Sequence, residues 1–177
     1  LKMKRLLIVV DYQNDFVNGS LGFNGAEKLE KRIVELIKEY KNNNDEVIYT
    51  MDTHYDDYLN TFEGQNLPVE HCIDGTSGWD LYGETKELLK DCLCFKKPTF
   101  PSLELGEYLK DKEYSSITLV GLVSHICVIS NAVIVKAAQP NTPIYLDLEA
   151  TSSIDLETHQ KCIDVMKSMH FKFLNEK

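Results

Sequence analysis

Short runs of apolar residues alternate along the chain with stretches in which apolar residues recur at helical spacing. The apolar runs predict strands at about residues 5–10, 46–51, 92–97, 116–120, 143–147 and 171–174. The helical patterns predict helices at about residues 25–42, 102–112, 125–139 and 155–169. Apolar strands between amphipathic helices are typical of a parallel sheet that is covered on both faces. We therefore predict a single α/β domain over residues 1–177, with three α/β/α layers around a mostly parallel, doubly wound sheet.

Three of the predicted strands end beside chemically reactive side chains. Asp11 directly follows the first apolar run, Lys97 ends the third, and Cys127 lies near the start of the helix after the fourth. Ligands of open parallel sheets bind at the carboxyl ends of the strands, so these three side chains can converge. Together they would supply a nucleophile, its base and a positive charge partner. A lone cysteine in an apolar stretch is usually core, but a helix start is expected to lower the pKa of a thiol.

The segment from about residue 52 to 82 is too long for a plain connection, and loops of this length are usually functional. Asp52 and His54 lie two apart directly after a strand, which points both side chains to one face. Imidazole and carboxylate groups suit a transition metal with open positions, and His71 on the following loop can complete the set. Each histidine taken singly is better explained as a solvated loop residue; only the set as a whole favours ligation.

The reactive residues lie in three motifs, Asp11-Tyr12-Gln13-Asn14-Asp15-Phe16, Lys97-Pro98-Thr99-Phe100 and Gly121-Leu122-Val123-Ser124-His125-Ile126-Cys127-Val128. Their order, with the insert at about 52–82, resembles the isochorismatase-like cysteine hydrolases over nearly the whole chain, and specifically the nicotinamidase branch. The resemblance implies that Asp11, Lys97 and Cys127 form a catalytic triad. It also implies a divalent transition metal (zinc, manganese or iron) held by Asp52 with His54 and His71.

Glu63 is a candidate further ligand, because some members of this family place a carboxylate near this position. A solvated loop acid is the equally open alternative. No organic cofactor is expected, because Gly19, Gly22 and Gly25 have neither the spacing nor the position of a dinucleotide-binding loop.

The resemblance further implies the reaction, which is hydrolysis of a small (hetero)aromatic amide, nicotinamide to nicotinate plus ammonia, through a thioester on Cys127. The oxyanion would be held by the backbone N–H groups of Cys127 and Val123, the latter after a cis peptide bond. Phe16 and Phe100 match aromatic wall positions of the substrate pocket, and Leu21 is a further candidate; ordinary core packing is the alternative for each.

Two other functions stay open. A family amidase acting on N-carbamoyl or ureido substrates would keep the triad without needing the metal set. A catalytically silent binding or scaffold protein is the second alternative, suggested by His125, which stands where most relatives carry an acid. Isochorismatases, which cleave a vinyl ether, usually lack the thiol, so Cys127 argues against that activity.

Composition bounds the partners and the compartment. The chain of 177 residues is 43% hydrophobic, which is enough for one sizeable core. Its formal net charge of -9, without a clustered basic face, argues against nucleic acid. No apolar run approaches the roughly 20 residues that span a membrane. The five cysteines lack the tight spacing of a disulfide framework, which favours reduced thiols. We expect two of them, Cys92 and Cys94, to lie in the core. We expect a cytoplasmic homo-oligomer that binds a small-molecule amide substrate.

Overall fold

The computed structural model describes residues 2–177 and contains one six-stranded sheet in which every neighbouring pair of strands is parallel. The strands are β1 (Arg5–Val10), β2 (Glu46–Asp52), β3 (Leu93–Lys97), β4 (Ser116–Leu122), β5 (Ile144–Ser152) and β6 (Lys172–Leu174). Their order across the sheet is β3-β2-β1-β4-β5-β6. The chain winds outward from β1 in one direction and from β4 in the other, which confirms the doubly wound α/β prediction. The sheet is wholly parallel, where the sequence indicated only a mostly parallel one.

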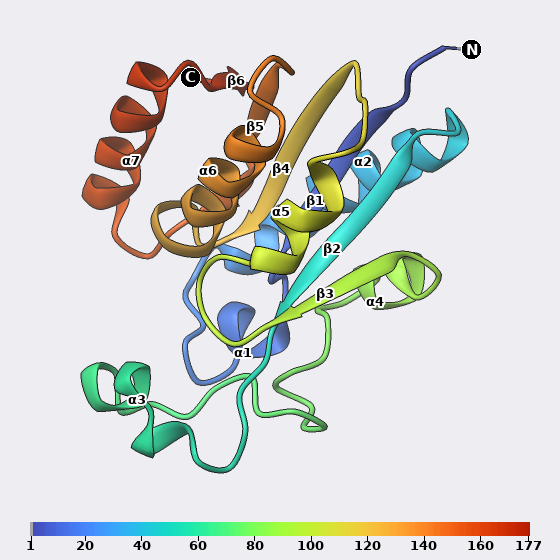
Figure 1. Ribbon diagram of the computed structural model, residues 1–177. Helices are drawn as coiled ribbons and strands as arrows, with labels where there is room; N and C mark the ends of the chain where they lie inside the picture. The colour runs from blue at the N-terminus through green and yellow to red at the C-terminus, as the bar shows by residue number, and fades with distance from the viewer. Residues whose placement is uncertain (1) are drawn as a thin grey trace.

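Helices cover both faces of this sheet (Figure 1). They are α1 (Asn14–Val17), the 3-10 helix η1 (Ala26–Leu29), α2 (Glu30–Asn42), the 3-10 helix η2 (Tyr58–Asn60), α3 (Phe62–Asn66), α4 (Thr85–Leu89), α5 (Leu103–Leu109), the π-helical turn η3 (Ser124–Val128), α6 (Ile129–Ala138) and α7 (Leu156–Ser168). Helices α5, α6 and α7 bury Leu105, Ala132 and Met166 against one face. Helices α2 and α4 bury Ile33 and Leu89 against the other. The three predicted layers are therefore present.

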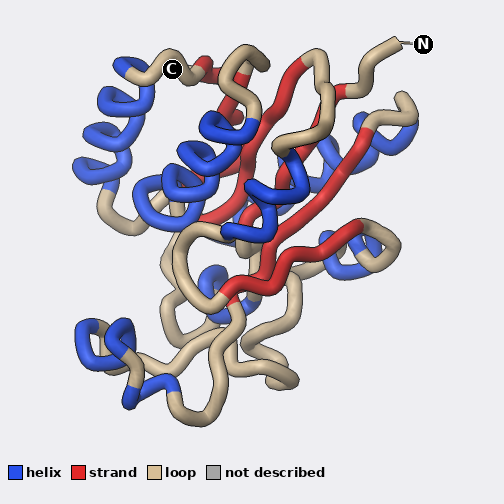
Figure 2. Tube along the Cα trace, in the orientation of Figure 1, coloured by secondary structure: helices blue, strands red, loops and turns tan. Residues whose placement is uncertain are grey.

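The switch in winding direction lies between β1 and β4, which are hydrogen-bonded neighbours. Such a switch opens a crevice outside the carboxyl ends of the strands. The insert between β2 and α4 lies beyond these strand ends, where the chain is mainly loop interrupted by the short helices η2 and α3 (Figure 2). No helix within residues 2–177 is long and apolar enough to cross a membrane.

Several elements differ from the sequence-based expectations. The helix predicted at 25–42 is split into η1 and α2. Gly25 precedes η1 with a φ of 102°, a conformation that glycine adopts readily because it has no Cβ. Strand β5 extends to Ser152, well beyond the predicted end at residue 147. Cys92 and Cys94, predicted to be core, are only half-buried and pack against the margin of the core, because Cys94 lies on the edge strand β3 and Cys92 directly precedes it.

Candidate active site

The ends of three strands bring together Asp11, Lys97 and Cys127. Lys97 Nζ lies 2.6 Å from Asp11 Oδ2 and 3.6 Å from Cys127 Sγ. The three residues are 0%, 1% and 6% exposed, respectively. The neighbouring Lys96 is exposed, and its Nζ lies 3.6 Å from Asp74 Oδ1 on the surface. Lys97, and not Lys96, therefore shares the buried cluster with the thiol.

Burial and mutual charge set the protonation of this cluster. Burial raises the pKa of the Cys127 thiol well above its ordinary value, and the positive charge of Lys97 only partly offsets this. Burial also raises the pKa of Asp11, against the opposing effect of Lys97. Burial would lower the pKa of Lys97, but the charges of Asp11, Cys127 and Asp52 raise it above its ordinary value. The expectation that a helix start lowers the thiol pKa is wrong here, because desolvation of the sulfur dominates. Cys127 thus rests as a thiol and needs a base.

The backbone and a hydroxyl group hold Asp11 in place. Thr50 Oγ1 donates a hydrogen bond to Asp11 Oδ1 at 2.6 Å, and the Asp11 N–H donates to Thr50 O at 3.2 Å. Asp11 has a φ of 47°, a left-handed conformation that is strained for a residue with a side chain. Strain of this kind clusters at functional sites. Sequence reasoning missed Thr50, although a buried threonine on the strand beside β1 was a usable signal.

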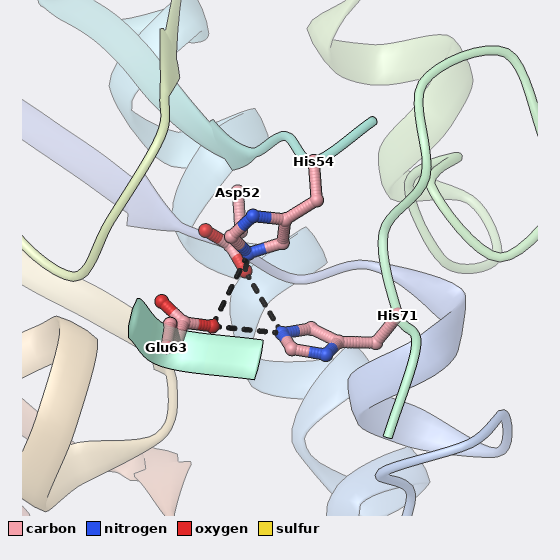
Figure 3. Close-up of side chains that lie close together, drawn as sticks. All are labelled: Asp52, His54, Glu63 and His71. Carbon is pink, nitrogen blue, oxygen red and sulfur yellow. Dashed lines mark hydrogen bonds and ion pairs between the residues drawn. The ribbon is translucent and has the colours of Figure 1, made fainter. Parts of the chain in front are cut away.

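Asp52, His54, Glu63 and His71 form a second cluster, in which the four potential ligand atoms all lie within 4.8 Å of one another (Figure 3). His54 Nε2 lies 3.0 Å from Asp52 Oδ2 and 3.4 Å from Glu63 Oε2. His71 Nε2 lies 3.3 Å and 3.5 Å from the same two oxygens. Glu63 comes from α3, and its side chain is only 16% exposed, so it belongs with the other three.

The donor set and its surroundings fit a divalent transition metal. Asp52 Oδ1 and Glu63 Oε1 are buried and accept no hydrogen bond from residues 2–177. His71 Nδ1 lies 2.8 Å from Val69 O, so that nitrogen donates to the carbonyl and Nε2 offers a lone pair to the cluster. Burial would lower the pKa of His54, but hydrogen bonds to Asp52 and Glu63 raise it to about 9. The carboxylate oxygens without a hydrogen bond and the shared imidazole proton suit the binding of a cation.

One cavity of about 250 Å³ joins the two clusters. Cys127 lines one side of it, and Asp52, Glu63 and His71 line another. Lys97 Nζ lies 3.7 Å from Asp52 Oδ1 and so links the thiol cluster to the metal cluster. A molecule in this cavity would contact both.

The other walls of the cavity are mainly apolar and include all three predicted substrate residues. Phe16, Leu21 and Phe100 line it, and the ring of Phe16 lies 5.5 Å, centroid to centroid, from that of His71. Val123 also lines the cavity and follows the cis peptide bond that the family resemblance implied. Phe100 is 40% exposed, so it stands at the entrance and is not ordinary core.

Two buried amides hold the site together, and sequence reasoning missed both. Gln13 Nε2 donates to Asp52 O, and the Asp52 N–H donates back to Gln13 Oε1, each at 2.9 Å. Asn131 Nδ2 donates to Phe100 O at 3.0 Å and to Cys127 O at 2.8 Å. A polar residue four positions after Cys127 in a mainly apolar helix was the available signal for Asn131.

The histidines outside the metal cluster have different surroundings. His125 lines the cavity, and its buried Nδ1 has no hydrogen-bond partner within residues 2–177. His159 is half-buried on α7, and its Nδ1 lies 2.6 Å from Ser124 Oγ. His170 is exposed just after α7. His159 therefore contacts the turn that carries Cys127.

Comparisons with known proteins identify the family. The isochorismatase domain matches residues 5–174 of the chain. The "uncharacterized isochorismatase family protein PncA" of Bacillus subtilis (strain 168) is 31% identical over 169 residues, which are 89% of this chain and 91% of that protein.

Solved structures of similar proteins have the same fold as this chain. The nicotinamidase/pyrazinamidase PncA from Bacillus subtilis has a TM-score of 0.86 at 28% identity, covering 98% of this chain and 100% of that one. The pyrazinamidase of Pyrococcus horikoshii in complex with zinc shares the fold, with a TM-score of 0.84 at 23% identity over 98% and 99% of the two chains. Since the domain match spans almost the whole sequence, this chain belongs to the isochorismatase family.

Proposed function

We propose that this protein hydrolyses a small (hetero)aromatic amide, nicotinamide, to nicotinate and ammonia, with Cys127 as the nucleophile. The observation that carries the proposal is the single cavity onto which both Cys127 and the Asp52, His54, Glu63 and His71 cluster open. A flat ring between Phe16 and Phe100 would place its amide near the thiol and its far side toward the cluster. The named activities of the Bacillus subtilis and Pyrococcus horikoshii proteins point the same way.

The reaction would begin with proton transfer. Because burial keeps Cys127 as a thiol, the buried carboxylate of Asp11 is the base that takes its proton, and the ammonium group of Lys97 stabilises the resulting thiolate. The thiolate attacks the amide carbon. The backbone N–H groups of Val123 and Cys127 are the proposed donors to the oxyanion, a contribution typically worth roughly 100-fold or more in rate.

Collapse of this intermediate breaks the C–N bond. Asp11 returns the proton to the departing nitrogen, ammonia leaves, and an acyl thioester remains on Cys127. Asp11 then takes a proton from water, the hydroxide attacks the thioester carbon, the C–S bond breaks, and Asp11 gives that proton to the departing sulfur. The products are the carboxylic acid and the regenerated thiol. A divalent ion on Asp52, His54, Glu63 and His71 would supply an open coordination position for a ring nitrogen.

Ammonia release from nicotinamide, pyrazinamide and an N-carbamoyl amide, each with and without a strong chelator, tests the proposal. We expect turnover of the two aromatic amides, lost on chelation and restored by zinc, manganese or iron. Chelator-resistant turnover of the N-carbamoyl amide alone would instead assign the metal-independent amidase function. No ammonia from any of them, together with a Cys127 that resists alkylation at neutral pH, would favour the silent binding protein.

A further inference from the structure

A second cavity, of about 530 Å³, lies on the far side of the β5–α7 connection from the catalytic pocket. It is about twice as large as the catalytic pocket. Its lining comes from η1 and α2, the outer part of β5, the first half of α7 and residues 175–177 after β6. Strand β6 pairs only with residues 145–147 of β5, so residues 148–152 form an open edge along this cavity. The proposed reaction uses none of its residues.

The edge of β5 is irregular at this place. The pairing of β4 with β5 shifts between Leu119 and Gly121, which leaves extra residues in β5. Such bulges are frequent next to functional sites. Thr151, on the cavity wall, is 1% exposed, and its Oγ1 has no hydrogen-bond partner within residues 2–177. A buried hydroxyl without a partner is costly unless a ligand or a water satisfies it.

The free charges around this cavity favour an anion. Lys28, Lys31 and Arg32 line it on one side. Neither lysine forms an ion pair with residues 2–177, whereas Arg32 is bonded through Nε to Asp147 and through Nη1 to Glu35. Glu35, Glu149, Glu176 and Lys177 also line the cavity. Glu35 is paired with Arg32 and Glu176 with Lys167, whereas Glu149 and Lys177 form no ion pair with residues 2–177. In a chain with a formal net charge of -9, a pair of unneutralised ammonium groups over a cavity is distinctive.

This cavity shares two structural links with the catalytic pocket. Residues Thr151 and Ser152 line the second cavity, and the next three residues, 153–155, line the catalytic pocket, so one short segment is the wall between them. His159 lines the second cavity and contacts the Ser124 hydroxyl. The two residues on either side of Ser124, Val123 and His125, line the catalytic pocket. The wall and the His159–Ser124 contact therefore connect the second cavity to the turn that carries Cys127.

We infer that the cavity between α2, β5 and α7 is a binding site for a small anion with a phosphate or carboxylate group, and that its occupancy controls the reactivity of Cys127. Lys28 and Lys31 attract the anion, and the Thr151 hydroxyl donates to it. The added negative charge disfavours the thiolate, and the bound anion fixes the shared wall. Binding at this site does not depend on the proposed function.

Calorimetric titration of the metal-loaded protein with inorganic phosphate, and separately with succinate, tests the site and distinguishes the two anion chemistries. We expect saturable binding of one of them with a stoichiometry of one. The double variant Lys28→Ala/Lys31→Ala should weaken it about tenfold, the loss of roughly 1.4 kcal/mol of charge interaction. Thr151→Val should weaken it as well. Lys38→Ala, on the same helix but outside the cavity, is the matched control and should leave binding unchanged.

Two results would overturn the site itself. One is the absence of saturable binding of either anion. The other is binding that His54→Ala abolishes and the double lysine variant leaves intact, because the anion would then sit at the metal cluster.

The control of Cys127 is tested by its alkylation with iodoacetamide, which needs no turnover. We expect the saturating anion to slow alkylation about fivefold, the lower end of ordinary coupling between sites, and the double lysine variant to remove the effect. Binding without any change in alkylation rate would refute the coupling, and so would an equal slowing in the double lysine variant.

Discussion

The thiol cluster and the metal cluster share one pocket but are built in opposite ways. Asp11 directly follows β1, Lys97 ends β3, and Cys127 lies in the turn η3 just after β4, so the parallel sheet itself sets their distances. Only Asp52 of the metal cluster lies on a strand, while His54, Glu63 and His71 come from the insert. The thiol cluster should therefore tolerate changes in the insert, whereas the metal cluster depends on both parts.

The insert compensates for its lack of regular structure with specific side-chain bonds. Asp15 Oδ2 accepts the backbone N–H of Cys72 at 2.8 Å, which fixes the chain next to His71. Tyr58 donates to Leu67 O at 2.9 Å and lies 3.3 Å from Glu63 Oε2. Each of these bonds joins segments that are not neighbours in a sheet, so losing one should loosen the ligands without disturbing the triad.

The largest expected effect is that of Cys127→Ala. Removing the nucleophile should lower ammonia release from nicotinamide by about 10⁴-fold or more, because the remaining groups cannot form the thioester. Circular dichroism and metal content should match those of the parent protein, since the metal cluster contains no cysteine. Cys94→Ala, a half-buried thiol on the edge strand, is the matched control and should keep its activity. Comparable turnover in the Cys127 variant would refute its role as nucleophile.

Lys97→Ala should come next, with losses in both rate and stability. It removes the positive charge between Asp11 and Cys127, and it leaves a buried carboxylate without its partner, which typically costs about 3–5 kcal/mol. We expect a fall in kcat of at least about 100-fold, measured with a thiolate-dependent alkylation assay alongside turnover. Lys96→Ala changes the same residue type one position away and should be nearly silent. A greater loss in Lys96→Ala would reverse the assignment.

The thiol cluster on the sheet was easier to predict from the sequence than the metal cluster on the insert. Asp11, Lys97 and Cys127 were identifiable because each ends or follows an apolar run, and the carboxyl ends of parallel strands meet at one edge. The role of Asn131 was not, since its bonds to Phe100 and Cys127 exist only after β3, α5 and α6 have packed.

The insert was the hardest part to predict. The sequence marked it as functional by its length, yet neither η2 nor α3 was expected there, because these short helices have little hydrophobic periodicity. Glu63 belongs to the cluster because of where α3 places it, and no local sequence pattern predicts that position. The raised pKa of Cys127 was missed for a related reason, because the position of a residue in a helix can be seen in the sequence and its burial cannot.

His54→Ala should separate the two clusters. It removes one of the four donors, so we expect loss of bound metal and at least about a 100-fold loss of nicotinamide hydrolysis. Cys127 should still react with iodoacetamide at close to the parent rate, because its neighbours Asp11 and Lys97 are unchanged. His170→Ala, an exposed histidine after α7, is the matched control for metal content. A sample that holds no transition metal yet remains fully active with chelator present would show that the cluster serves another purpose.

The smallest predicted effect is the release of a single proton when zinc binds, which tests the charge state of the metal cluster. Without a metal, hydrogen bonds to Asp52 and Glu63 raise the pKa of His54 to about 9, above the ordinary value of about 6.5. His54 is then protonated at pH 7, and a metal can bind only by displacing that proton. Calorimetry of zinc binding at pH 7 in buffers of different ionisation enthalpy should therefore report release of about one proton.

The sign of the pH dependence follows from the direction of the shift. A raised folded-state pKa means that the His54 proton stabilises the metal-free protein fully below pH 6.5, and that this contribution disappears as the pH rises through about 9. Zinc affinity should accordingly increase with pH up to about 9. If the pKa of His54 were unperturbed, the affinity would instead level off near pH 6.5. His125→Gln, which alters a pocket histidine outside the cluster, should release the same proton. Zero proton release at pH 7, with normal zinc affinity, would mean that His54 is already neutral and that the carboxylates of Asp52 and Glu63 do not share its proton.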